Sequence, residues 1–142
     1  IKLFLTDGCL LGAYREKNFI SWDNDVEFCV FDEEINEHFD DIVNDLLKEN
    51  FIVRTIKEYP NAKINSYYEG EKVGMLSLYK KSNFRHRHLY KWPAYFFDDN
   101  ETITFKKEKF ICPKIEDYLK YQYGSDWKTP KKTNYLSREL FK

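Results

Sequence analysis

Residues 22–28 read Trp22-Asp23-Asn24-Asp25-Val26-Glu27-Phe28, which places a carboxylate at every second position of a run otherwise suited to a strand. Side chains alternate between the two faces of a strand, so Asp23, Asp25 and Glu27 are predicted to project together. The residues between them would face the core. Three neighbouring anions repel one another unless a hard cation lies among them, so the pattern predicts a Mg²⁺ or Mn²⁺ site. A solvent-exposed edge strand with an acidic outer face would give the same pattern.

The residues upstream favour the metal-site interpretation. Residues 1–5 alternate well enough for a strand, and residues 9–15 contain good helix formers. Gly8 falls between them, at a predicted strand-to-helix turn. Backbone N–H groups at such a turn, together with the positive end of the helix, can hold a phosphate.

Two ordered blocks of the chain resemble the LicD and fukutin-related transferases. The first block reads G-C-L-L-G-A-Y-R from Gly8 and F-I-S-W-D-N-D-V-E-F from Phe19. The second block reads F-I-C-P from Phe110, E-D-Y-L from Glu116 and Y-G-S-D-W-K-T-P from Tyr123. The resemblance implies a nucleotidyltransferase domain with a DNA polymerase β-like core. Such a domain typically moves a phospho-alcohol from a CDP-activated donor to a glycan and releases CMP.

The resemblance also implies the substrates and the catalytic residues. The transferred group would be phosphocholine-like, ribitol-phosphate-like or glycerol-phosphate-like, and the acceptor a hydroxyl of a glycan or glycolipid. Asp23, Asp25 and Glu27 would be the catalytic metal ligands, with Glu27 replacing the aspartate more usual at the last position. Two alternatives remain open: nucleotidyl transfer to a small hydroxylated acceptor, and a non-catalytic module that binds a glycan or nucleotide.

Three residues of the first block are candidates for binding the donor phosphates: Gly8, Cys9 and Arg15. Arg15 could contact phosphate in a bidentate manner, and an ordinary surface arginine fits the pattern about as well. Cys9 replaces the small hydroxyl residue usual in the superfamily, and a buried structural thiol fits it better than a nucleophile. For Asp7, a turn residue is favoured over a substrate contact.

Polymerase β-like enzymes commonly place a further acidic residue on a neighbouring strand. The best candidate strand here, residues 73–79, has Ser77 in its middle and lacks a carboxylate. Either Asp23, Asp25 and Glu27 suffice, or a residue from the region of Asp98, Asp99 or Asp126 completes the site.

A cluster of cations and aromatic residues begins with Arg85-His86-Arg87-His88 and is predicted to lie in a loop. Arg85 and Arg87 are candidate phosphate contacts, whereas a solvated position is favoured for the two histidines. The His-x-His spacing is too weak to indicate zinc, because no further ligand is adjacent. Asp126, in the C-terminal block, is a further candidate substrate contact.

Composition sets the remaining expectations. A chain of 142 residues with net charge −1 is predicted to be a single LicD-like domain, residues 1–142, possibly lacking preceding N-terminal residues, without a general attraction to nucleic acid. Cys9, Cys29 and Cys112 are too few and too dispersed for a disulfide framework, which suggests a reducing compartment. No apolar run approaches the roughly 20 residues of a membrane span, and no targeting signal is visible. A cytoplasmic location, of the bacterial type, is therefore expected.

Periodicity predicts an α+β fold, in which a small mixed or antiparallel sheet is backed by helices. The clearest helix covers residues 33–48, with Asp32 as its cap. A strand is expected at residues 51–56, hairpins at 62–79 and 102–112, and a helix at 115–123 that stops at Gly124.

Overall fold

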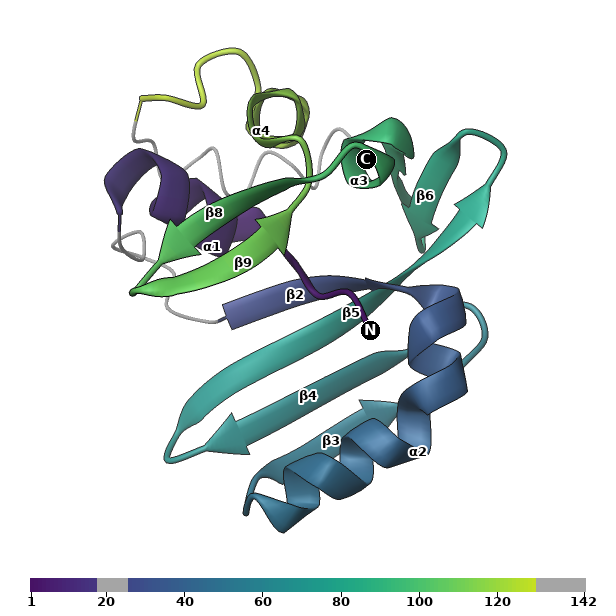
Figure 1. Cartoon of the computed structure of the whole chain (residues 1–142). Coiled ribbons are helices and arrows are strands. Elements are labelled where there is room, and N and C mark those ends of the chain that lie inside the picture. Colours follow the sequence, from purple (N-terminus) through teal and green to yellow (C-terminus); the bar gives the residue numbers. More distant parts are fainter. Residues whose placement is uncertain (18–25, 130–142) are drawn as a thin grey trace.

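The computed structural model describes residues 1–17 and 26–129, and the strands of this part of the chain form one mixed sheet (Figure 1). The sheet order is β3-β4-β5-β2-β1-β9-β8, and β6 and β7 extend from one end of β5. The strands are β1 (Phe4–Leu5), β2 (Val26–Phe31), β3 (Ile52–Ile56), β4 (Lys63–Tyr68), β5 (Glu71–Lys81), β6 (Phe84–Arg87), β7 (Tyr90–Pro93), β8 (Glu101–Phe105) and β9 (Glu108–Cys112). The helices are α1 (Asp7–Leu11) with a π-helical continuation η1 (Gly12–Glu16), α2 (Asp32–Lys48), α3 (Tyr95–Asp98) and α4 (Ile115–Tyr123). A mixed sheet with helices agrees with the predicted α+β class.

Strand β2 lies at the centre of the sheet and determines which residues share a face. It runs parallel to β5 and antiparallel to β1, so Cys29 lies beside Leu76 on one side and Phe4 on the other. Because paired residues point to the same face, Glu27 and Cys29 project with Leu76. Val30 projects to the opposite face.

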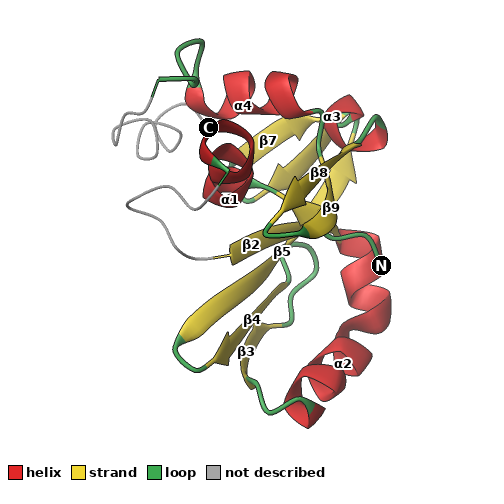
Figure 2. Cartoon of the chain, turned by 60° about the vertical axis from the view of Figure 1, so that its left-hand side comes forward, coloured by secondary structure: helices red, strands yellow, loops and turns green. Residues whose placement is uncertain are grey.

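Helices cover both faces of β2. Figure 2 shows α1 and α4 packed together on one side and α2 on the other. The larger core, on the side of α1 and α4, includes Leu10, Phe97, Tyr118 and Leu119. The core under α2 consists of Val30, Ile35, Phe39, Ala62 and Ile64. The face that carries Glu27 is therefore enclosed by α1 and α4.

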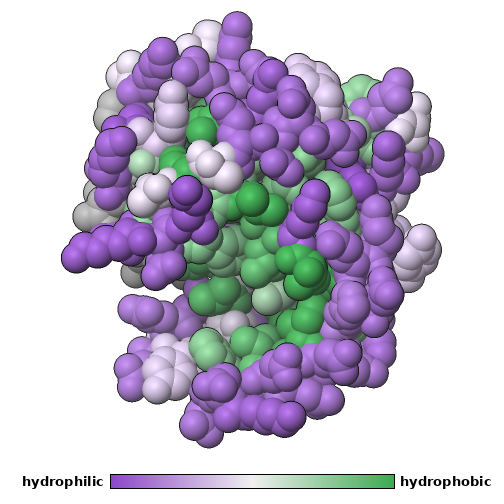
Figure 3. Space-filling model, in the orientation of Figure 1, coloured by the Kyte–Doolittle hydropathy of each residue, from purple (hydrophilic) through white to green (hydrophobic). Residues whose placement is uncertain are grey.

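The face of the molecule seen in Figure 1 is polar around its edge and has an apolar hollow at its centre, beside α2 (Figure 3). Partly buried hydrophobic residues such as Leu3, Leu46, Val53 and Met75 pack around the core at this helix. Apolar packing therefore dominates this side.

Most of the predicted elements are confirmed. Helix α2 begins one residue earlier than predicted, β3 and the β4–β5 and β8–β9 hairpins lie where expected, and α4 has the predicted bounds. The capping role of Asp32 is wrong, because Phe31 occupies the N-cap and Asp32 is already helical. The loop at residues 85–88 is also wrong, because Arg85 and Arg87 belong to β6, which pairs with β7.

The strand-to-helix turn lies earlier than predicted. Thr6 is the N-cap of α1, and Gly8 is a buried residue inside the helix. Within the residues that the structure covers, no helix is both long and apolar enough to cross a membrane.

Candidate active site

A cavity of about 130 Å³ lies against the face of β2 that carries Glu27. Its apolar floor comes from Cys29, Leu76 and Leu78, and Tyr90 and Trp92 of β7 add aromatic walls. Pockets for whole small molecules usually measure about 300–1,000 Å³. The cavity is therefore suited to an ion or to one small group of a larger substrate.

Glu27 lines this cavity and is partly exposed. Its neighbour on β5 is Gly74, where an added Cβ would lie 3.1 Å from Asn65 Oδ1 and 3.8 Å from Glu27 Cγ. The absence of a side chain at Gly74 thus leaves room for both polar groups. Asp23 and Asp25 lie outside the described residues, so their convergence with Glu27 stays a prediction.

Asp7 lines the same cavity, which sequence reasoning did not anticipate because it favoured a turn role. Its Oδ1 accepts a hydrogen bond of 3.1 Å from Gln122 Nε2, and Gln122 Oε1 accepts one of 2.9 Å from Trp92 Nε1. The Tyr118 hydroxyl lies 3.5 Å from the same Asp7 oxygen. The sequence contained one indication of this role, because Gln122 is a polar residue on the otherwise apolar buried stripe of α4.

Cys29 lies beneath the two carboxylates and is buried. Burial raises the pKa of this thiol far above its ordinary value, and the charges of Asp7 and Glu27 raise it further. Its sulfur lies 3.4 Å from Thr6 Oγ1. Cys29 is therefore a neutral thiol at physiological pH when no cation is bound.

The other two cysteines are also free and buried, and burial was the sequence-based prediction for Cys9. Burial raises the pKa of Cys112 to about 12, so this thiol is protonated as well. Cys9 packs in the larger core and does not line the cavity, which agrees with a structural role.

Ser77 does not occupy the position of the missing carboxylate. It pairs with Val30, so it projects to the face opposite Glu27. The β5 positions beside Glu27 and Cys29 are Gly74 and Leu76. Strand β5 therefore provides no carboxylate to the cavity. The positions where a carboxylate is missing are Gly74 and Leu76, and not Ser77 as the sequence indicated.

Arg87 lines the cavity but is held by the backbone. Its Nη1 donates hydrogen bonds of 3.0 Å to the Ala62 carbonyl and 3.2 Å to the Ser77 carbonyl. Burial lowers its pKa, although a guanidinium remains protonated throughout the physiological range. Arg87 thus contributes a fixed positive charge, which supports its prediction as a candidate anion contact.

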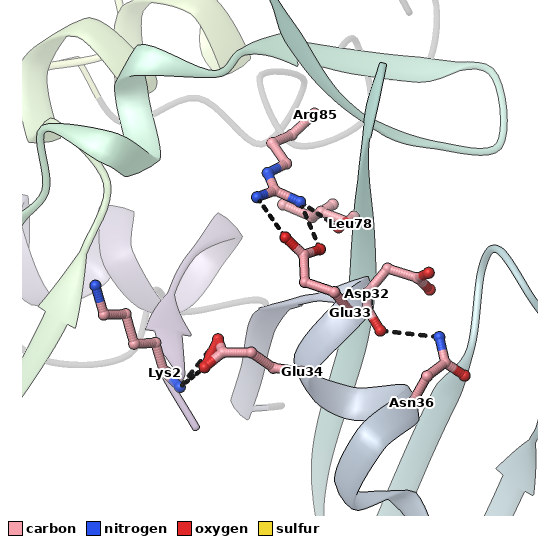
Figure 4. Close-up of polar contacts among 7 residues, drawn as sticks. All are labelled: Lys2, Asp32, Glu33, Glu34, Asn36, Leu78 and Arg85. Atoms are coloured by element: carbon pink, nitrogen blue, oxygen red, sulfur yellow. Dashed lines mark hydrogen bonds and ion pairs between the residues drawn. The ribbon is translucent and has the colours of Figure 1, made fainter.

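Arg85, two residues earlier, forms part of the structural framework instead. Its guanidinium makes a bidentate ion pair with Glu33, at 2.9 and 3.0 Å, and donates to the Leu78 carbonyl (Figure 4). It also lies over the Phe31 ring, 3.7 Å from the centroid. With its side chain 5% exposed, Arg85 links β6 to the start of α2 and is poorly placed to bind a substrate.

Asp32 and Glu33 are adjacent in α2 but their pKa values shift in opposite directions. Burial raises the pKa of Asp32 above 3.8, and among the described residues nothing hydrogen-bonds to its Oδ1. In Figure 4 its carboxylate points away from Arg85. The ion pair with Arg85 lowers the pKa of Glu33 below 4.5.

We expect Asp32→Asn to stabilise the protein at pH 7. The pKa of Asp32 is higher in the folded state than in the unfolded state. Its ionisation therefore costs no stability below pH 3.8, and the stability of the protein decreases as pH rises through the folded pKa. A pKa difference of one between folded and unfolded states is worth about 1.4 kcal/mol. Thermal melts between pH 3 and pH 8 should show the gain at pH 7 and its disappearance at pH 3.

Glu33→Gln is the matched control and should have the opposite effect. Its lowered pKa means that stability is present above pH 4.5 and decreases as pH falls through the folded pKa. Because the Glu33 side chain is 61% exposed, solvent screening limits the loss at pH 7 to about 1 kcal/mol. A lower melting temperature for Asp32→Asn at pH 7 would contradict the argument from burial.

Arg15 lies in a second, open pocket of about 500 Å³ rather than in the cavity. Lys17, Lys128 and the rings of Tyr14 and Trp127 also line this pocket, and the two ring centroids are 5.8 Å apart. Basic groups beside aromatic rings suit a phosphorylated ligand. The pocket lies beside η1, at the other end of the α1–η1 segment from Asp7.

The guanidinium of Arg15 already has protein partners. It donates to the Trp127 carbonyl at 2.9 Å, and its Nε and Nη2 donate to Glu16 at 3.1 and 2.6 Å. A bidentate contact with phosphate would require Arg15 to release Glu16. The exposed Lys17 and Lys128 therefore supply the more accessible positive charges.

The other predicted site residues lie away from the cavity. Asp126 is exposed in the turn after α4, and Asp99 pairs with Lys114 at 3.1 Å. His86 stacks on Tyr79, whereas His88 is exposed at the edge of the cavity. Among the described residues, no three His, Cys, Asp or Glu side chains are arranged to hold a metal ion. A complete site would need the acidic residues at 23 and 25.

Comparison with known proteins gives one family. The family model described as "LicD/FKTN/FKRP, nucleotidyltransferase domain" matches residues 1–119. No curated protein matches the chain. The match includes β2, the residues that line the cavity other than Gln122, and the β6–β7 hairpin, and it ends within α4.

Proposed function

Because this chain belongs to the LicD/FKTN/FKRP family, which suggests a phosphotransferase-like function, we propose a specific reaction for it. The protein transfers a phospho-alcohol from a CDP-activated donor to a hydroxyl of a glycan or glycolipid, in a reaction that depends on Mg²⁺ or Mn²⁺. A polymerase β-like core is part of the proposal. The observation that carries it is the cavity on β2, which Glu27 and Asp7 both line.

The residues of the cavity fit a hard divalent cation. Zinc favours thiolate and imidazole ligands, whereas Mg²⁺ and Mn²⁺ favour carboxylate oxygens. Glu27 supplies a carboxylate oxygen at the cavity, and Asp7 lines the same cavity. Asp23, Asp25 and Glu27 would hold the cation, which would neutralise charge on the donor diphosphate.

The protein's own groups would position the reactants. In the proposed step, the acceptor hydroxyl oxygen forms a bond to the phosphorus of the phospho-alcohol, and the bond from that phosphorus to the diphosphate bridging oxygen breaks. CMP leaves, and the acceptor proton passes to solvent or base. The fixed charge of Arg87 would favour the donor diphosphate in the cavity, and Lys17 and Lys128 would offer a further anion contact at the open pocket.

Calorimetric titration with CDP-choline, CDP-ribitol, CDP-glycerol and CDP, each with Mg²⁺ or Mn²⁺, tests the donor part of the proposal. We expect metal-dependent binding of at least one CDP-alcohol, and its loss in Asp25→Asn. Absence of binding by the folded protein would overturn the CDP-donor proposal. The head group that binds best then enters a turnover assay.

Product analysis distinguishes the two reactions that this site could catalyse. Release of CMP indicates transfer of the phospho-alcohol, whereas release of the free alcohol phosphate indicates transfer of the nucleotidyl group. A third outcome, ligand binding without turnover, is favoured by one observation. Strand β5 carries Gly74 and Leu76 where a further carboxylate would face Glu27.

A further inference from the structure

The two neighbours of β2 differ in what they bring to the cavity. Strand β5 presents Gly74 and Leu76 beside Glu27 and Cys29, and neither residue can bind a cation. On the other side, β1 is antiparallel to β2, with Leu5 beside Phe28. The chain then continues through Thr6 to Asp7, whose carboxylate lines the cavity together with Glu27.

Asp7 is held in an unusual conformation. Its φ of 55° lies in the left-handed region, which residues other than glycine adopt rarely and aspartate adopts more readily than most. Such a conformation persists only where surrounding contacts maintain it, and it is common at functional sites. Asp7 is the first residue of α1, and it also lines the cavity.

A chain of two hydrogen bonds, one buried and one partly buried, orients the carboxylate as well. Trp92 Nε1 donates to Gln122 Oε1 at 2.9 Å, and Gln122 Nε2 donates to Asp7 Oδ1 at 3.1 Å. The bond between Trp92 and Gln122 is buried, and the bond from Gln122 to Asp7 is partly buried. Hydrogen bonds from outer residues are a common means of orienting metal ligands.

Charge in the cavity also favours a cation. Asp7 and Glu27 line the same cavity, and each side chain ends in a carboxylate. Arg87 lines the same cavity and offsets one of these charges, which leaves a net negative charge among the three groups. Two carboxylates facing one cavity of about 130 Å³ are stabilised by a cation placed between them.

We infer that Asp7 is a ligand of the divalent cation at this site, in place of the carboxylate that β5 lacks, and that Gln122 positions it. The inference rests on the proposed function, because the cation itself belongs to that proposal. It assigns a ligand from outside the acidic strand. Binding needs only a carboxylate oxygen and involves no proton transfer.

Calorimetric titration of the full chain with MnCl₂, without nucleotide, tests this assignment. Asp7→Asn should weaken Mn²⁺ binding at least about tenfold, the range in which changes near metal ligands act. Asparagine tolerates a positive φ and retains an oxygen for Gln122, so the melting temperature should stay close to that of the wild type. Asp117→Asn, an exposed carboxylate on α4, is the matched control and should bind Mn²⁺ like the wild type.

Two further variants separate the possible failures. Glu27→Gln should weaken Mn²⁺ binding whether or not Asp7 is a ligand. If Glu27→Gln loses Mn²⁺ binding while Asp7→Asn binds Mn²⁺ like the wild type, the role of Asp7 is overturned and the proposed cation site remains. Absence of Mn²⁺ binding by the folded wild-type chain would overturn both. Gln122→Met should weaken binding less than Asp7→Asn, and a change in melting temperature without a change in Mn²⁺ affinity would overturn the positioning role.

Discussion

Glu27→Gln is expected to slow the transfer reaction at least about 100-fold, a loss of roughly 2.7 kcal/mol of transition-state stabilisation. The substitution keeps the shape of the side chain and removes the charge that would hold a divalent cation at the cavity. Glu27 is partly exposed, so its neutral replacement should not unfold the protein. The measurement is the rate of CMP release from the CDP-alcohol that binds best, with saturating Mg²⁺ or Mn²⁺.

The control for this variant is Glu71→Gln, an exposed residue at the start of β5 that does not line the cavity. It should retain the wild-type rate. Thermal melts of both variants establish that the fold is intact. A Glu27→Gln protein that turns over at more than a third of the wild-type rate would contradict a role for this carboxylate in catalysis.

Phe97→Ala is expected to produce the largest loss of stability, about 3–5 kcal/mol. Phe97 is 1% exposed, and its ring contacts Phe4 at 5.4 Å, Tyr118 at 6.3 Å and Phe31 at 6.4 Å between centroids. Removing the ring leaves a void among strands β1 and β2 and helix α4, which cannot all move to fill it. Urea denaturation followed by circular dichroism gives the change in the free energy of unfolding.

Tyr95→Ala lies in the same short helix and is the matched control. Its side chain is 53% exposed, so its removal should cost less than about 1 kcal/mol. A Phe97→Ala protein that loses no more stability than Tyr95→Ala would mean that the larger core rearranges around the void.

Phe97→Ala should also weaken Mn²⁺ binding, because Phe97 packs against Tyr118, whose hydroxyl lies near Asp7.

Local patterns in the sequence were sufficient for the elements that depend on one segment. Helix α2 follows from an apolar stripe at Ile35 and Phe39, and α4 ends at Gly124, which adopts a positive φ of 96°. The turn at Gly70 likewise joins two strands that alternate as the sequence predicts. In each case periodicity and one special residue carry the information, because the contacts that form the element lie within a few residues of it.

The arginines show where local reasoning failed. Arg85 and Arg87 have the composition of a solvated basic loop, yet both are buried in β6. Their burial depends on partners distant in the sequence: Glu33 for Arg85, and the carbonyls of Ala62 and Ser77 for Arg87. A charge is buried only where such partners are supplied, and no single segment of the sequence reveals them.

The residues of the candidate site also differ in whether one segment of the sequence was enough to predict their place. Alternation within one strand predicted that Glu27 would share a face with Asp23 and Asp25, and the structure places Glu27 on a cavity. Which residues face it from other segments depends on register. A shift of one residue moves a side chain to the other face of the sheet, so the parallel pairing of β2 with β5 excludes Ser77 and brings in Leu76.

The sequence by itself determined the family and the order of most helices and strands, and it predicted a hard cation at residues 23–27. It did so because periodicity, turn residues and ordered motifs are properties of contiguous segments. Only the tertiary structure decided that Asp7, Gln122 and Trp92, which are separated by up to 115 positions, form one hydrogen-bonded chain. It likewise decided that Arg85 belongs to the framework. Those outcomes depend on how distant segments pack, because burial and register are set by the whole fold.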